Sequence, residues 1–206
     1  MTSSYSILGE KLFEGKHSSI YHDGIASEGL QMLWDDVAQI YVGGTVHSIN
    51  GIPNGENRAI KIIDSHNNEI IFELAAFFRM KQENRDQFGN AYAFILKNIF
   101  AKQWTKFLQT IINGEHYSFG NFNIAKEGLY ISKVVATWKG AKEGFDIVET
   151  PYIKNSYTRD GSFYIQYQVP KKKFKLIAER MGEVKYIPNI HIVQSYINYI
   201  NQVKTN

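Results

Sequence analysis

One short frame occurs twice in this chain and limits what the chain can fold into. An acid, a glycine and an aliphatic residue come first, and a tryptophan follows ten residues after the glycine. The first copy runs from Asp23-Gly24-Ile25 to Trp34, and the second runs from Glu127-Gly128-Leu129 to Trp138. A repeat of 104 residues exceeds the period of a solenoid and suits two successive domains of one fold. The frame therefore predicts a duplicated domain.

Short runs of β-prone residues fill the first part of each half. They are separated by glycine, asparagine and proline, which favour turns. The clearest run alternates apolar Ile60 and Ile62 with Lys61, as expected for a strand with one face in a core. The predicted strands are 10–13, 18–21, 31–33, 37–42, 58–63 and 69–74 in the first half, and 117–124, 129–132, 145–149, 162–169 and 173–177 in the second.

An amphipathic helix is predicted to close each half. Apolar residues recur every three to five positions from Phe88 to Ile111, which predicts a helix over about 84–112. Asn84 is the expected N-cap, and Asn113-Gly114 the expected stop. A second helix is predicted over about 190–203, with Asn189 as its N-cap. Its buried stripe is predicted to be Val193, Tyr196, Ile197, Ile200 and Val203.

These elements predict a mainly β fold with α-helices, in the α+β class. Its two tandem barrels of antiparallel strands would span 1–113 and 114–206, each capped by its C-terminal helix. The first helix is longer than one small barrel needs, so its last part is expected to be buried against the second domain or against another copy of the chain. That part contains Trp104, Phe107, Leu108 and Ile111.

The repeated glycines and tryptophans have structural interpretations. Gly24 and Gly128 are expected in hairpin turns that need a positive φ, which glycine adopts without steric cost. Trp34 and Trp138 are expected to anchor a core, the alternative being exposed platforms for a ligand, and the two tryptophans are predicted to superpose. In the first half Asp35-Asp36-Val37 follows the tryptophan, whereas Lys139-Gly140 follows it in the second.

The order of these motifs resembles a bacterial family of tandem pleckstrin-homology-like domains of unknown function. The motifs are Asp23-Gly24-Ile25, Trp34-Asp35-Asp36-Val37, Gly114-Glu115-His116-Tyr117-Ser118-Phe119-Gly120, Glu127-Gly128-Leu129 with Trp138, and Ile187-Pro188-Asn189 before the last helix. The resemblance covers nearly the whole chain. It implies two pleckstrin-homology-like barrels and no particular activity.

The composition is that of an ordinary globular chain. Hydrophobic residues make up 44%, the formal net charge is +3, and no run reaches the eighteen or so apolar residues of a membrane span. The absence of cysteine excludes disulfides and thiolate chemistry. The first five residues, Met1 to Tyr5, lack the basic and apolar regions of a secretory signal, so a cytoplasmic location is expected.

Few residues suggest chemistry. Gly9 to His17 differs from a phosphate-binding loop in spacing, and His17 replaces the hydroxyl residue of that motif. The best metal candidate is His22 beside Asp23, with Asp35-Asp36 near in space, although turn residues are also polar for solubility alone. No metal, nucleotide or other cofactor is therefore expected. The protein is not expected to be an enzyme, although loops can hold a site that the order of residues does not reveal.

The strongest charged feature is a lysine cluster of Lys171, Lys172, Lys173 and Lys175. Two interpretations stay open: a binding site for an anionic lipid or phosphate, and a solvated strand edge on which lysine prevents aggregation. No basic face interleaved with aromatic residues is recognisable, so nucleic acid is not an expected partner.

Two functions follow. The first is a non-catalytic module that binds a protein or peptide, with an extended peptide added at a barrel edge or between an edge strand and the capping helix. The alternative is a peripheral membrane or anionic-ligand sensor that uses the lysine cluster. Homo-oligomerisation stays open in both.

Overall fold

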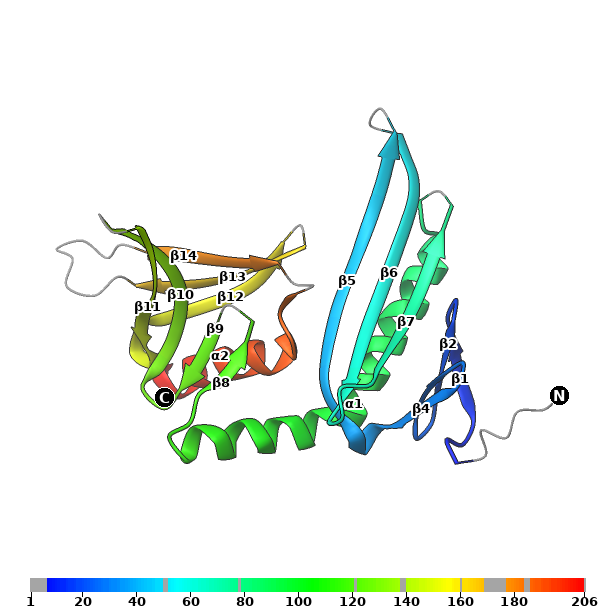
Figure 1. The fold of residues 1–206 in the computed structure, drawn as a ribbon, viewed down its shortest axis with the longest axis horizontal. Helices are drawn as coiled ribbons and strands as arrows, with labels where there is room; N and C mark the ends of the chain where they lie inside the picture. The colour runs from blue at the N-terminus through cyan, green and yellow to red at the C-terminus, as the bar shows by residue number, and fades with distance from the viewer. Residues whose placement is uncertain are drawn as a thin grey trace. The chain divides into compact units, whose positions relative to one another are not determined.

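The computed structural model describes residues 7–49, 52–77, 79–120, 122–137, 140–159, 161–168, 177–183 and 186–205. The chain divides into two compact units, 1–103 and 104–206. The same order of elements occurs in both: four strands, a 3-10 helix, three strands and an α-helix (Figure 1). The predicted domain boundary at residue 113 stays a prediction.

The first unit contains two antiparallel sheets. The first sheet consists of β1 (Lys11–Glu14), β2 (Ser18–Tyr21), β3 (Gly24–Ser27) and β4 (Leu30–Leu33), in that order. The 3-10 helix η1 (Trp34–Asp36) leads to the second sheet, which consists of β5 (Val37–Ile49), β6 (Ile52–Asp64) and β7 (Glu69–Ala76). The helix α1 (Gln82–Ile112) follows.

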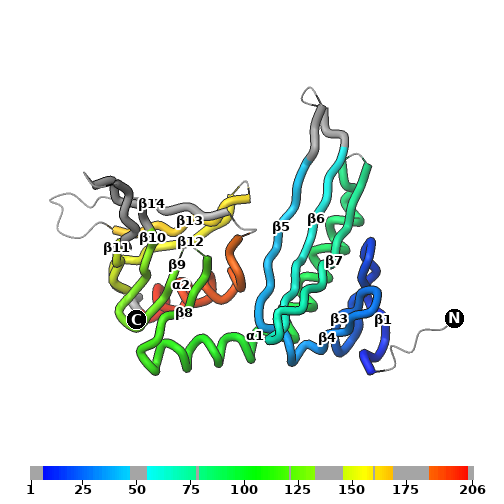
Figure 2. Tube along the Cα trace, viewed as in Figure 1, coloured from blue at the N-terminus to red at the C-terminus, as the bar shows by residue number. Residues whose placement is uncertain are grey.

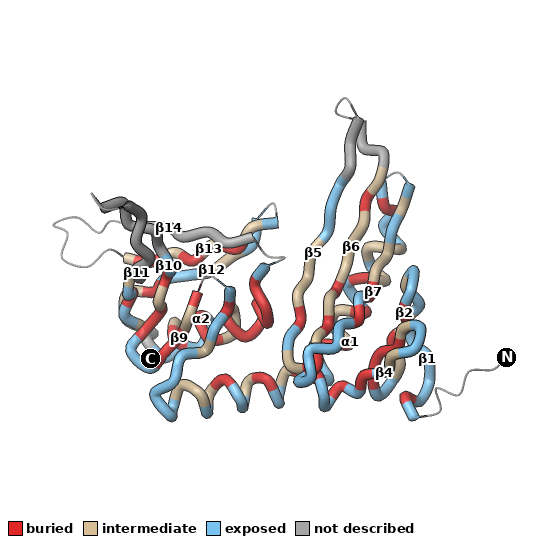
Figure 3. Tube along the Cα trace, viewed as in Figure 1, coloured by how far each residue is buried: buried red, intermediate tan, exposed pale blue. Residues whose placement is uncertain are grey.

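The core of the first unit lies between its two sheets and α1, where buried residues gather (Figure 3). Register places Ile40, Ile62 and Ile70 side by side on β5, β6 and β7, because alternate residues of paired strands share a face. The helix adds the predicted stripe of Phe88, Ile95 and Ile99, together with Ala91. The alternation of Ile60 and Ile62 with Lys61 is confirmed.

The second unit repeats this arrangement. Its first sheet consists of β8 (Tyr117–Phe119), β9 (Phe122–Ala125), β10 (Gly128–Thr137) and β11 (Gly140–Glu149). After η2 (Thr150–Tyr152), the second sheet consists of β12 (Ile153–Arg159), β13 (Ser162–Gln168) and β14 (Ile177–Glu183), and α2 (Ile190–Thr205) follows. Phe107, from the last turns of α1, is fully buried here against Tyr117, Phe119 and Tyr196.

The α+β class, the antiparallel sheets and the two helices confirm the coarse prediction. The predicted barrels are not closed in the described part of the chain, where each unit has two separate sheets. Two strands, β3 and β12, were not predicted. The single strand predicted over 117–124 is wrong, because this segment contains the antiparallel pair β8 and β9. Of the predicted strand 173–177, only Ile177 lies within the described residues.

The helix ends were predicted with mixed success. The stop after α1 is confirmed: Gly114 has a φ of +78°, and the N–H groups of Gly114 and Glu115 donate to the carbonyls of Ile111 and Thr110, as in a Schellman motif. Asn84 is not the N-cap, because α1 already begins at Gln82.

The second helix begins directly after Asn189, as predicted. Four members of its predicted stripe are buried. The fifth, Val203, is 59% exposed, so its inclusion was wrong. It lies in the last turns of the helix, where the core no longer covers this face.

Gly24 and Gly128 occupy the same place in the two units. Each begins the third strand of its unit, opposite the last residue of the fourth strand. A Cβ on Gly24 would lie 2.2 Å from the carbonyl oxygen of Met32, and one on Gly128 would lie 2.2 Å from that of Val148. The prediction of a turn position is wrong, because these strand positions require glycine for the close approach of the opposite backbone. The predicted positive φ is confirmed at Gly128, where φ is +157°.

The tryptophans do not correspond. The N–H of Trp34 donates to the carbonyl of Asp23 at 3.1 Å, and that of Thr150 donates to the carbonyl of Glu127 at 3.2 Å. Thr150 therefore has the place of Trp34, and the predicted superposition on Trp138 is wrong. Both tryptophans follow their glycine by ten residues, but for different reasons. The two four-residue strands β3 and β4, with the turn between them, separate Gly24 from Trp34, whereas the single ten-residue strand β10 separates Gly128 from Trp138.

Trp34 is a core residue, as predicted. It is buried, its ring contacts Phe94, and its Nε1–H donates to the carbonyl of His22 at 2.9 Å. Trp138 lies outside the described residues, so its predicted burial stays a prediction.

Candidate functional site

The first strand of the three-stranded sheet in the first unit has an exposed edge. β5 has 13 residues, and among the described residues β6 is the only strand paired with it (Figure 2). The N–H of Thr45 donates to Oδ1 of Asn57 on β6 at 2.9 Å, so the N–H of Thr45 faces β6. Because backbone direction alternates along a strand, Val42, Gly44 and Val46 direct their N–H and C=O groups away from β6.

The side chains of these three residues leave this edge accessible. Val42 is half-buried, Gly44 is exposed, and Val46 is 60% exposed. A Cβ on Gly44 would lie 2.7 Å from the carbonyl oxygen of Asn57 and 3.4 Å from Cγ of Arg58. Glycine at this position therefore keeps the edge strand close to β6 and leaves room beside Arg58.

A buried carboxylate lies next to this edge. Glu56, opposite Val46 on β6, is only 5% exposed. Its Oε2 accepts from the N–H of Met80 at 3.0 Å and from Nη2 of Arg85 at 2.7 Å, and its Oε1 accepts from Nε of Arg58 at 3.3 Å. These contacts connect β6, near its first residues, to Met80 just before α1 and to Arg85 in the first turn of α1.

The charge of Glu56 is maintained by its partners. Burial raises the pKa of this carboxyl, but hydrogen bonds from Met80, Arg85 and Arg58, together with the positive charge of Arg85, hold it below its ordinary value. Glu56 is therefore ionised at neutral pH. The sequence pattern contained a signal for this cluster, because the alternation of apolar residues stops at Glu56-Asn57-Arg58, but it did not show that Glu56 would be buried.

The other end of β5 is occupied by α1. A bulge interrupts the register between Val37 and Gln39, and the carbonyl of Ala38 within it accepts from Nε2 of Gln103 at 3.4 Å. The second unit repeats this device: β12 has a bulge between Ile153 and Asn155, and the carbonyl of Lys154 accepts from Nδ2 of Asn201 at 2.6 Å. In both units a side-chain amide from the helix thus donates to a backbone carbonyl near the start of the edge strand.

The outer face of the β5–β7 sheet is polar. Nζ of Lys61 lies 4.9 Å from the centre of the Tyr41 ring and 3.4 Å from Oε2 of Glu69. The hydroxyl of Tyr41 donates to Oε1 of Gln39 at 3.0 Å. The positive charge on this face is therefore already paired.

The corresponding strand of the second unit is shorter. β12 has seven residues, including its bulge. On it, Tyr157 stacks on Tyr164 of β13, with ring centres 4.9 Å apart and planes inclined by 10°. The guanidinium of Arg159 lies 5.5 Å from the Tyr164 ring. This edge offers fewer backbone groups than β5.

The predicted metal candidate gains little support. Nδ1 of His22 and Oδ1 of Asp23 are 2.7 Å apart, and Trp34 brings η1 to this turn. All four predicted residues, His22, Asp23, Asp35 and Asp36, are exposed. Within the described ranges no three His, Asp or Glu side chains converge in a group that could hold a metal ion.

The segment from Gly9 to His17 forms β1 and the turn into β2 instead of preceding a helix. The N–H of Lys16 donates to the carbonyl of Glu73 on β7 at 2.9 Å. This turn therefore joins the two sheets of the first unit.

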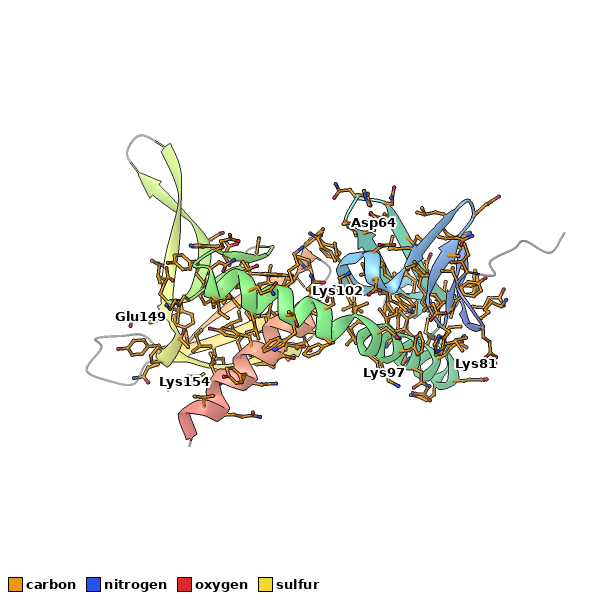
Figure 4. All side chains as sticks on the ribbon, turned by 90° about the horizontal axis from the view of Figure 1, so that it is seen from below. Asp64, Lys81, Lys97, Lys102, Glu149 and Lys154 are labelled. Carbon is orange, nitrogen blue, oxygen red and sulfur yellow. The ribbon has the colours of Figure 1, made fainter. Side chains whose placement is uncertain are left out.

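The lysine cluster of Lys171, Lys172, Lys173 and Lys175 lies outside the described residues. Along α1, the labelled Lys97 and Lys102 lie on separate turns (Figure 4), and Nζ of Lys102 donates to the carbonyl of Asp35. Over the ranges that the structure covers, neither helix has the length and hydropathy that crossing a membrane requires.

Comparison of the chain with protein-family models, with curated proteins and with solved structures gives no match. A function for this chain therefore has to come from its own residues, and the backbone edge of β5 is the feature in the described structure best suited to bind a partner.

Proposed function

We propose that the protein is a non-catalytic binding module that accepts an extended peptide as an added strand on β5. The observation that carries the proposal is the 13-residue edge strand with a single neighbouring strand among the described residues. A peptide paired with such an edge gains backbone hydrogen bonds, and its alternate side chains give specificity.

The proposal includes the architecture. The two halves of the chain, 1–113 and 114–206, are each a pleckstrin-homology-like domain, because four strands, three strands and a helix follow one another twice. The glycine contact, the 3-10 helix, the bulge and the helix amide also recur at equivalent places. A cytoplasmic location and the absence of a required cofactor belong to the same proposal.

The test selects peptides from a displayed random library on the full-length chain. Bound peptide should slow amide exchange at Val42, Gly44 and Val46, since these N–H groups would become hydrogen-bonded. Val46→Pro removes one outward N–H without removing a bond to β6, so we expect at least about tenfold weaker binding.

The matched control is Val46→Ala, which shortens the same side chain and keeps the N–H. It should bind the selected peptide within about threefold of the original chain, because one exposed apolar side chain contributes little. Failure to recover any peptide, or exchange protection confined to other strands, would exclude strand addition on β5.

The lysine cluster supports a second candidate, binding to anionic membranes. Four lysines within residues 171–175 would bind vesicles that contain phosphatidylserine, and the affinity would fall as salt rises. Binding that is insensitive to salt, or equal binding to neutral vesicles, would exclude it.

A further inference from the structure

We infer that Arg58 selects an acidic side chain on the peptide that pairs with β5. The inference rests on the proposed function and adds the chemical class of the ligand. It begins from the charges beside the edge: Arg58 and Arg85 share a single buried carboxylate, Glu56. One positive charge is therefore left over at this place.

The two arginines do not bind Glu56 equally. Arg85 donates from Nη2 at 2.7 Å and is mostly buried, whereas Arg58 donates only from Nε, at 3.3 Å. The Arg58 side chain is 38% exposed, and its Nη groups make no hydrogen bond within the described ranges. Arg85 is thus the structural counter-ion, and Arg58 holds the charge that a ligand can reach.

The position of Arg58 directs this charge toward the edge. Arg58 lies opposite Gly44 on the neighbouring strand, and its Cγ is 3.4 Å from the place of a Cβ on Gly44. Because Gly44 has no side chain, the residue of β5 opposite Arg58 places no side chain between Arg58 and a strand added beyond β5.

An added strand would lie about 9.6 Å from β6, twice the usual spacing between strands. An arginine side chain on β6 and a glutamate side chain on the added strand together span this distance when they point toward each other. A carboxylate on the same face could then accept two parallel hydrogen bonds from the Nη groups. The partner is therefore an extended peptide with an acidic residue beside Gly44.

The test uses the selected peptides described above. We expect Asp or Glu to be enriched at one position. Replacing that residue with its amide should weaken binding to the original chain about five- to tenfold, as for a partly exposed charged hydrogen bond. In an Arg58→Gln chain the same peptide change should alter binding less than twofold.

Lys61→Gln is the matched control, because Lys61 lies on β6 as well, but on the outer face and paired with Glu69. It should retain the full preference for the acidic peptide. Arg58→Lys should retain part of it, because lysine keeps the charge and loses the two-pronged geometry. Melting curves establish that each variant folds, which is expected because Arg85 and Met80 still hold Glu56.

The outcomes separate the two proposals. Peptides that protect β5 without any preference for an acid would overturn the role of Arg58 and leave strand addition standing. An acidic preference that persists in Arg58→Gln would do the same. Recovery of no peptide would overturn both.

Discussion

The two units share one order of elements but lengthen different hairpins. In the first unit the long hairpin is β5–β6, with 13 residues in each strand, whereas in the second it is β10–β11, with ten in each. The close approach of the opposite backbone at Gly24 and Gly128 and the two bulges occur in both units despite these different lengths. The difference teaches that a repeated frame can keep its core while hairpin length decides which strand edge is presented.

The edge strands show the consequence. After the bulge and the contact with the helix, β5 continues for ten residues beyond Gln39, to Ile49, whereas β12 ends at Arg159, four residues beyond Asn155. A peptide can therefore form more backbone hydrogen bonds on β5. This comparison favours the first unit as the place of the proposed peptide binding.

The largest expected effect is a loss of stability in the second unit alone, when a ring is removed from its core. Phe107→Ala removes a fully buried ring that packs on Tyr117, Phe119 and Tyr196, and should destabilise the second unit by about 3 to 5 kcal/mol. Denaturant unfolding measures the loss. Ile112→Ala, at a residue 75% exposed on the same helix, should change stability by less than about 0.5 kcal/mol.

Trp104 tests how far this core extends along α1. It is half-buried and its ring centre lies 5.4 Å from that of Phe107. Trp104→Ala should cost less than Phe107→Ala, because part of its surface is already in water. A larger loss for Trp104→Ala than for Phe107→Ala would contradict this prediction.

Acid should weaken the second unit before the first. Burial lowers the pKa of His191 from 6.5 to about 4, so the folded state keeps this ring neutral. Its stabilising contribution, on the order of 3 kcal/mol, is complete above pH 6.5 and is lost as pH falls toward 4. The lowered pKa of Glu56 affects the first unit only below its ordinary value of 4.5.

The measurement is amide exchange or denaturant unfolding of each unit between pH 7 and pH 4. His191→Gln should remove most of the pH dependence of the second unit in this window, whereas Glu56→Gln should not. Equal acid sensitivity of both units above pH 5 would contradict the assignment of the pH dependence to His191.

The smallest effect tests whether the duplicated glycines are equivalent. Gly24→Ala and Gly128→Ala each place a Cβ 2.2 Å from a backbone oxygen, so each should cost about 1 to 3 kcal/mol, in its own unit. Gly89→Ala is the control, since nothing lies within 4 Å of its added Cβ on α1. It should stabilise the chain by about 0.5 to 1 kcal/mol, because alanine favours helix. A large cost for only one strand glycine would break the equivalence.

Much of the local structure was predictable. The helical stripes from Phe88 to Ile99 and from Val193 to Ile200 are buried, and most strands lie where β-prone runs predicted them. β3 and β12 escaped because Gly24-Ile25-Ala26-Ser27 and the polar run from Lys154 to Arg159 lack a strong alternation. The site was less predictable: the edge strand was expected as a class of site, but neither Glu56 nor Arg58 was singled out.

What the sequence determined by itself is the kind and order of elements, because the periods of 2 and 3.6 residues are local properties of a strand and a helix. The repeated glycine also indicated a duplication before any contact was known. Only the tertiary structure decided why that glycine is needed and that Thr150, not Trp138, matches Trp34. It alone brought Arg85 to Glu56 across 29 positions. These features depend on backbone and charged groups far apart in the chain, and no local pattern reports such distances.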